Sequence, residues 1–69
     1  MTGTKRVVVR GGGSNLYQIT VSGRTHSVQK VTVNLLSNSY KNIGRTDSLD
    51  DALSLIRSHS GRDIESISS

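Results

Sequence analysis

Length, composition and charge set the first limits on this chain. Its 69 residues are enough for one domain, and they include no Cys, Trp, Phe or Pro. Without Cys, neither a disulfide framework nor a thiolate metal site can form. Val, Ile and Leu together number 18 of the 69 residues, which is enough to expect a folded domain with a modest core.

The charges divide the chain into two parts. Residues 1–45 carry seven cations and no Asp or Glu, whereas residues 46–69 carry a net charge of −3. No apolar stretch approaches the roughly 18 residues that span a bilayer, and no basic-then-apolar leader opens the chain. We therefore expect a cytoplasmic protein with no membrane partner. Because small cores without disulfides often gain stability by self-association, a homodimer is also a reasonable expectation.

Four segments in the basic part have the composition of β-strands, with Gly, Ser or Asn between them. The predicted strands are Lys5–Arg10, Leu16–Ser22, His26–Leu36 and a short Tyr40–Ile43 that Gly44 closes. The run Gly11–Asn15 predicts a flexible loop or a wide hairpin, because three consecutive glycines disfavour a strand.

Alternating apolar residues predict which face of these strands packs on the core. The predicted core face consists of Val7, Val9, Tyr17, Ile19, Val21, Val31, Val33 and Leu35. Val28 is out of phase with the last three. Either a bulge lies near Gln29 and Lys30, or Val28 packs on the other face.

The acidic part predicts a helix. Ser48 suits the N-cap, the apolar stripe contains Leu49 and Ile56, and Gly61 suits the position after the last turn. The following residues, 62–69, form either a short final strand or an ordered tail.

The resulting fold class is α+β. We expect a small two-layer single domain over residues 1–69, with one C-terminal helix on one face of an antiparallel sheet. The sheet has three to four strands, or five if the final segment pairs, and residues 1–4 and 68–69 are expected to be flexible ends. In topology this arrangement is similar to small DNA-binding domains such as the arm-binding modules of phage integrases. Topology does not carry function, and no residue motif here assigns the chain to that family.

The face opposite the predicted core is basic and polar. It would carry Arg6, Arg10, Gln18, Thr20, Lys30, Thr32 and Asn34, while Arg24, Lys41 and Arg45 extend it from the turns. Cations suit phosphates, and amides or hydroxyls suit base edges and sugars, so the six cations Arg6, Arg10, Arg24, Lys30, Lys41 and Arg45 are candidate nucleic-acid contacts. The alternative is a merely solvated face whose cations protect strand edges. The scarcity of aromatics disfavours single-strand binding by base stacking.

No motif indicates catalysis, a cofactor or a metal. A strand, not a helix, follows Gly11–Gly13, so a phosphate loop is not expected. His26 is expected at a turn edge and His59 against the helix C-terminal carbonyls. Asp50 and Asp51 diverge on the helix and already serve its positive end. We therefore expect no enzyme and no small-molecule substrate.

Two binding functions remain open. The first is contact with DNA or RNA through the basic sheet face. The second is a protein-interaction or homodimerisation module, in which the basic half meets the acidic residues Asp47, Asp50 and Asp51 of another copy. Strand addition at an exposed edge of Lys5–Arg10 would be another route to such a complex.

Overall fold

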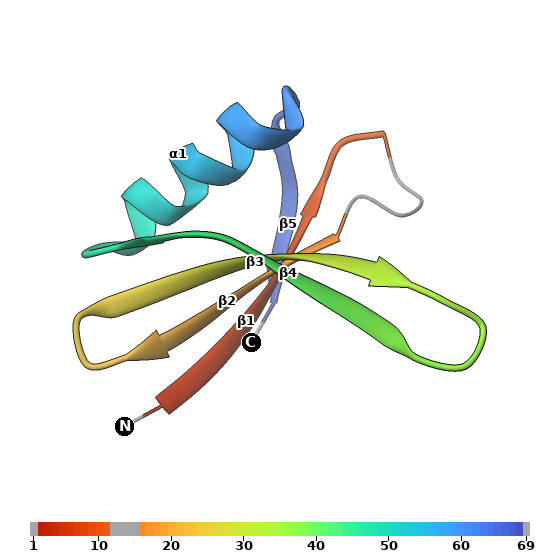
Figure 1. The fold of residues 1–69 in the computed structure, drawn as a ribbon. Coiled ribbons are helices and arrows are strands. Elements are labelled where there is room, and N and C mark those ends of the chain that lie inside the picture. The colour runs from red at the N-terminus through yellow and green to blue at the C-terminus, as the bar shows by residue number, and fades with distance from the viewer. Residues whose placement is uncertain (1, 12–15, 69) are drawn as a thin grey trace.

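In the computed structural model, which describes residues 2–11 and 16–68, one helix lies across one face of a five-stranded antiparallel sheet (Figure 1). The predicted α+β class is confirmed, and the final segment, for which a strand and a tail were both left open, forms a strand. The elements are β1 (Thr2–Val9), β2 (Leu16–Ser22), β3 (Thr25–Val33), β4 (Asn38–Thr46), α1 (Leu49–Ser60) and β5 (Ile64–Ser68). Of the loop expected at Gly11–Asn15, residues 12–15 lie outside the described part.

Strand order in the sheet is β4-β3-β2-β1-β5, so the first strand of the chain is an inner strand. Arg6 pairs with Gln18 of β2 on one side and with Ser68 of β5 on the other. The expected free edge at Lys5–Arg10 is therefore wrong for residues 6–8, because β2 pairs with one side of these residues and β5 with the other. Among the residues expected to be flexible ends, residues 2–4 pair with β2 and Ser68 pairs with β1, while residues 1 and 69 lie outside the described part.

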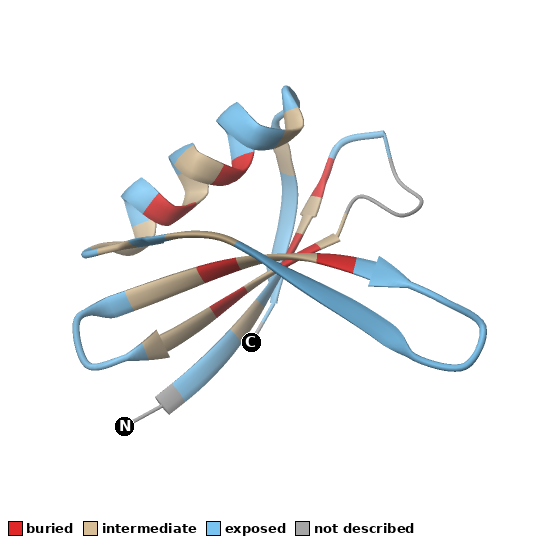
Figure 2. Ribbon diagram, in the orientation of Figure 1, coloured by how far each residue is buried: buried red, intermediate tan, exposed pale blue. Residues whose placement is uncertain are grey.

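Burial is concentrated between α1 and the sheet (Figure 2). The buried cluster consists of Val7, Val9, Tyr17, Ile19, Val28, Ala52 and Ile56. The helix begins as predicted, with the Ser48 side chain accepting a hydrogen bond from the Asp51 N–H at 3.2 Å. It ends at Gly61, whose φ of 71° is left-handed and whose N–H donates to the Arg57 carbonyl at 2.8 Å.

The β2–β3 turn decides which side of β3 faces the helix. Gly23 has a φ of 60°, and the two-residue connection Gly23-Arg24 places Ser22 opposite Thr25. A glycine at the first central position is typical of the type II′ hairpin turn. Counting back from this pair places Val28 opposite Ile19, on the helix side of the sheet.

The prediction that Val31, Val33 and Leu35 face the helix is consequently wrong, although Val31 is buried as expected of a core residue. Val31 pairs with Leu16 and lies on the open face, away from the buried cluster, and Val33 lies on the same face two residues further. Leu35 lies beyond the strand and is fully exposed. Val28 lies on the opposite face from these valines, but that face is the helix side, so Val28 is in the core and does not pack away from it as the alternative supposed.

Strand β4 is longer than predicted and contains a bulge. Val28 pairs with Gly44 and Gln29 with Asn42, so Ile43 is the extra residue. Gly44 does not end the strand. It lies under α1, where a Cβ atom would come within 2.7 Å of Leu55 Cδ2.

Candidate functional site

The face of the sheet that α1 leaves open carries two aligned rows of polar side chains. Register places Arg6, Gln18, Gln29 and Asn42 side by side across β1, β2, β3 and β4. The adjacent row consists of Thr4, Thr20, Ser27 and Arg45. We call these eight residues the polar band. All eight are exposed or half-buried.

The two cations of the polar band lie on its outer strands. Arg6 is on β1 and Arg45 on β4, three interstrand spacings and one row apart, which corresponds to about 16 Å. Between them, the Thr20 hydroxyl donates to the Gln29 side-chain oxygen at 3.4 Å. The band therefore presents amides at its centre and guanidinium groups at its flanks.

An apolar row adjoins the polar band on the same face. It consists of Val8, Leu16, Val31 and Tyr40, aligned across β1 to β4. Val31 is only 3% exposed, whereas Tyr40 at its outer end is 52% exposed. This row explains how a valine outside the main core is nevertheless buried.

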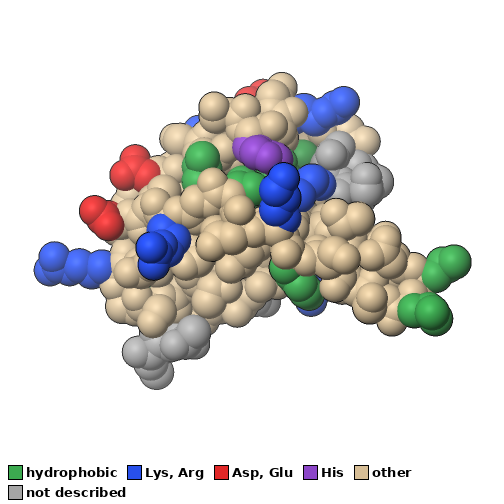
Figure 3. All heavy atoms as spheres, in the orientation of Figure 1, with side chains coloured by type: hydrophobic (Ala, Val, Ile, Leu, Met, Phe, Trp, Pro, Cys, Tyr) green, Lys and Arg blue, Asp and Glu red, His purple; other side chains and the backbone are tan. Residues whose placement is uncertain are grey.

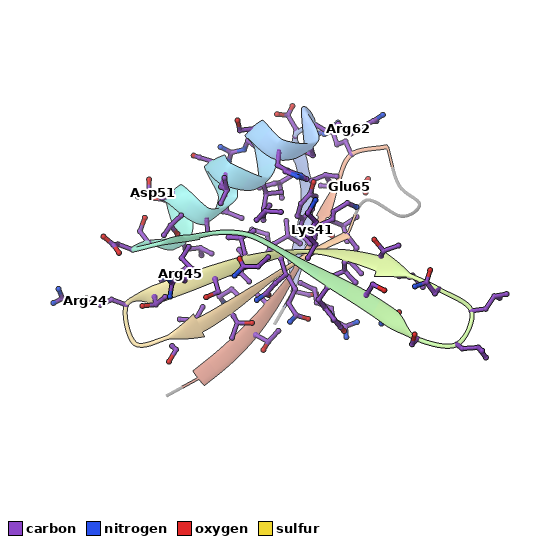
Figure 4. All side chains as sticks on the ribbon, viewed as in Figure 1. Arg24, Lys41, Arg45, Asp51, Arg62 and Glu65 are labelled. Carbon is purple, nitrogen blue, oxygen red and sulfur yellow. The ribbon has the colours of Figure 1, made fainter. Side chains whose placement is uncertain are left out.

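The six predicted cations do not form one patch. Arg6 and Arg45 belong to the polar band. Arg24 extends from the β2–β3 turn, away from the sheet (Figure 4). Arg10 follows β1, where its N–H donates to the Asp63 carbonyl at 2.8 Å and its own carbonyl accepts from Arg62 Nη1 at 3.4 Å.

Lys30 and Lys41 lie on the helix side of the sheet, which corrects the expectation that Lys30 is on the open face. Lys30 pairs with Tyr17 across β2–β3 and with Lys41 across β3–β4. Its ammonium nitrogen stands 5.0 Å from the centre of the Tyr17 ring, a cation–π geometry. The same change of phase that turned Val28 inward placed these lysines beside the core.

His59 contacts Tyr17, not the helix C-terminal carbonyls as expected. A hydrogen bond of 2.7 Å joins Tyr17 Oη and His59 Nδ1, and the two rings meet edge to face with centroids 5.7 Å apart. Burial raises the pKa of the Tyr17 hydroxyl above its ordinary value of 10.0. His26 lies beside its turn as expected, with Nδ1 3.1 Å from the Arg24 carbonyl oxygen.

The sequence predicted Arg6, Gln18 and Thr20 on this face and Arg45 as an extension from a turn. It did not predict Thr4, Ser27, Gln29 or Asn42 as members of the polar band. Ser27 and Gln29 were missed because β3 was read in the wrong phase, and Asn42 because the register of β4 was unknown. The signal that would have found the first two is Gly23-Arg24 as a two-residue turn, which fixes the β2–β3 register.

No protein-family model, curated protein or solved structure matches the chain. Within residues 2–11 and 16–68, no group of three or more His, Cys, Asp or Glu side chains could hold a metal ion. The helix in this part of the chain is not long and apolar enough to cross a membrane. Function must therefore be argued from the open face itself.

Proposed function

We propose that this protein binds duplex DNA through the polar band on the open face of its sheet. The observation that carries the proposal is the arrangement of the band: Arg6, Gln18, Gln29 and Asn42 form one row across β1 to β4, and Arg45 lies on β4 in the adjacent row. Arginines bind phosphates and position a protein on a duplex, while Gln and Asn amides bind base edges, adenine above all.

The dimensions of the band agree with this assignment. Arg6 and Arg45 are about 16 Å apart, somewhat wider than the roughly 12 Å major groove of B-DNA, so they would lie over the phosphates at its two edges. A sheet face lying in that groove would direct its central amides at the bases and its outer arginines at the phosphates of the two strands. The major groove of duplex RNA is too narrow and deep for such contact, and therefore DNA is the preferred partner.

The charge around the band favours the same partner. Residues 1–46 include no Asp or Glu, so no carboxylate from strands β1 to β4 opposes a phosphate. The acidic groups are in the helix and the segments beside it; Asp51, for example, lies at the start of α1 (Figure 4). A cytoplasmic location, as expected from the sequence, is part of this proposal.

The proposal is tested with matched pairs of charge-neutralising substitutions. Fluorescence anisotropy of labelled duplexes is measured between 50 and 200 mM salt for the wild type, for Arg6→Gln with Arg45→Gln, and for Arg57→Gln with Arg62→Gln. Both doubles remove two positive charges, but only the first removes them from the band. Circular dichroism checks that each variant is folded.

Each phosphate contact contributes about 0.9 to the slope of log affinity against log salt, so losing two should lower the slope by about 1.8. Over this fourfold salt range that difference corresponds to about 12-fold in affinity. We expect this change in the band double and none in the control double. Equal slopes in the two doubles, or no wild-type binding at 50 mM, would refute the assignment.

The alternative, a homodimerisation module, is favoured by the apolar row and by the 52% exposure of Tyr40 at its end. Stacking two open faces would, however, bring the arginines of both copies together with no carboxylate from that face between them. Light scattering during the titration distinguishes the two functions, because a dimer that forms without DNA would show as a doubled mass.

A further inference from the structure

The hairpin that joins β3 to β4 projects from the body of the protein. Every residue from Thr32 to Asn42 is exposed, and this end of the hairpin extends beyond both α1 and β5 (Figures 1 and 2). We call residues 32–40 the arm. Its tip is held by polar contacts: the Asn34 N–H donates to the Ser37 carbonyl at 2.9 Å, and the Asn34 side-chain amide donates to Ser39 Oγ at 3.2 Å.

Two leucines occupy the tip of the arm. Leu35 is 104% exposed and Leu36 is 99% exposed, and hydrophobic groups stand out at this end of the molecule in Figure 3. Hairpin tips ordinarily carry Gly, Asn, Asp or Ser, because these residues suit both the turn and the solvent. Two adjacent, fully exposed leucines instead indicate a contact that the isolated chain leaves unmade.

The neighbouring edge of the sheet is protected from association, in contrast to the tip. Strand β4 has Lys41 and Arg45 along its length and the bulge at Ile43 between them. Cations and bulges on an edge strand oppose pairing with a second sheet. The exposed leucines are therefore a localised apolar feature at the end of a polar and cationic hairpin.

Position relative to the polar band identifies the partner that fits. Val33, the last residue of β3, follows Gln29 by four residues, so the tip begins about 13 Å from the band. Lys30 and Lys41 stand at the base of the arm, and its remaining side chains include hydroxyls and amides that suit sugar and phosphate. The arm therefore fits a partner with dense negative charge, which its cations and polar groups would contact. The same partner must offer an apolar interior that the two leucines can enter.

We propose that Leu35 and Leu36 form a wedge that inserts between neighbouring base pairs of the duplex bound by the polar band. This inference rests on the proposed function. Apolar side chains that enter a base step unstack it partly and bend the helix by roughly 20–90°. The arm thus converts a sheet-face contact into a DNA-bending one, and flexible pyrimidine–purine steps are its preferred target.

The test separates binding from distortion. Duplexes of mixed sequence with a central TA step carry a fluorophore pair at their ends for energy transfer, or 2-aminopurine beside the step. Anisotropy measures binding on the same duplexes. The variants are Leu35→Ser with Leu36→Ser, which removes the wedge, and Leu35→Met with Leu36→Met, which keeps an apolar tip. None of these substitutions alters charge.

We expect the wild type and the Met pair to increase energy transfer and 2-aminopurine fluorescence. The Ser pair should bind with an unchanged salt slope but lose both signals. Bending by the Ser pair equal to that of the wild type, or wild-type binding without distortion, would overturn the wedge while leaving the proposed function intact.

Failure of the wild type to bind any duplex would instead overturn the proposed function, and the wedge with it. Two further controls identify another occupant. Both controls apply when no DNA distortion is seen. If the wild type shows a dimer mass in light scattering and the Ser pair does not, the leucines contact a second copy and not a base step. If the wild type sediments with vesicles containing anionic lipid and the Ser pair does not, they contact a lipid surface.

Discussion

Ile56 is the residue at which the attachment of α1 to the sheet can be measured most directly. Its side chain has no exposed area and belongs to the buried cluster that joins the two layers. Ile56→Ala removes three carbon atoms, each worth about 0.8 kcal/mol of transfer free energy, and the cavity left behind adds to this loss. The higher helix propensity of Ala returns a few tenths of a kcal/mol.

We therefore expect Ile56→Ala to lower the free energy of unfolding by about 3 kcal/mol, within the usual 2–5 kcal/mol for such deletions. A domain of 69 residues has a total of about 3–10 kcal/mol, so the variant should be close to half unfolded or lose a large part of its margin. Leu53→Ala is the matched control, because it deletes the same number of carbons from a half-buried position of the same helix. Its expected loss is about 1 kcal/mol.

Urea denaturation followed by far-ultraviolet circular dichroism measures both losses. A common slope against urea concentration shows that the comparison concerns stability and not compactness. If Ile56→Ala cost less than about 1 kcal/mol, or no more than Leu53→Ala, the packing of α1 on the sheet described above would be incorrect.

Three other predictions follow from the described contacts. In the Tyr40→Phe variant Tyr17 is the only tyrosine, and its absorbance titration at 295 nm should have a midpoint above pH 10.0. Because the pKa of Tyr17 is raised in the folded state, the neutral hydroxyl stabilises the folded protein fully below pH 10. This stabilisation falls as pH rises through the folded pKa. A midpoint at or below 10 would contradict the burial of this hydroxyl. Val28→Asp should prevent folding, whereas Val33→Asp, at a side chain 59% exposed, should cost less than about 1 kcal/mol in urea denaturation; the reverse order would restore the original core prediction. Ser48→Ala should cost about 1 kcal/mol in the same assay, and no measurable loss would argue against the N-cap.

The helix and the second strand could be predicted closely because their signals are local. Ser48 and Gly61 bound a continuous apolar stripe, and Leu16–Ser22 alternates without a break. Each of these patterns is determined by residues within the element. Tertiary contacts do not have to be known to read them.

The phase of β3 could not be read in this way. Two of its valines, Val31 and Val33, share one face of the strand, and Val28 lies on the other. The strand also buries a side chain on each face, Val31 on one and Val28 on the other. Alternation favours the majority, but pairing with β2 selects Val28 for the helix side. This single inversion also moved Lys30 off the candidate binding face and brought Gln29 onto it.

The sequence predicted a polar open face, but it predicted only some of the residues that lie there. Charge and polarity identified a basic open face and placed Arg6 on it, because β1 alternates regularly. Arg45 was expected only to extend the patch from a turn, whereas the bulge at Ile43 shifts the β4 register and aligns it with Ser27. A bulge depends on how two strands pair, so it cannot be predicted from the sequence of either strand alone.

The pairing of β1 with β5 has a consequence for the order of events during synthesis. Hairpins β1–β2, β2–β3 and β3–β4 join neighbouring segments and can form as soon as each leaves the ribosome. The outer side of β1, in contrast, stays unpaired until Ile64–Ser68 has been made. Throughout that interval the nascent chain presents the valine-rich backbone of β1 as a template for other chains. Translation speed over the helix, which separates the two strands in time, therefore sets how long this vulnerable intermediate persists.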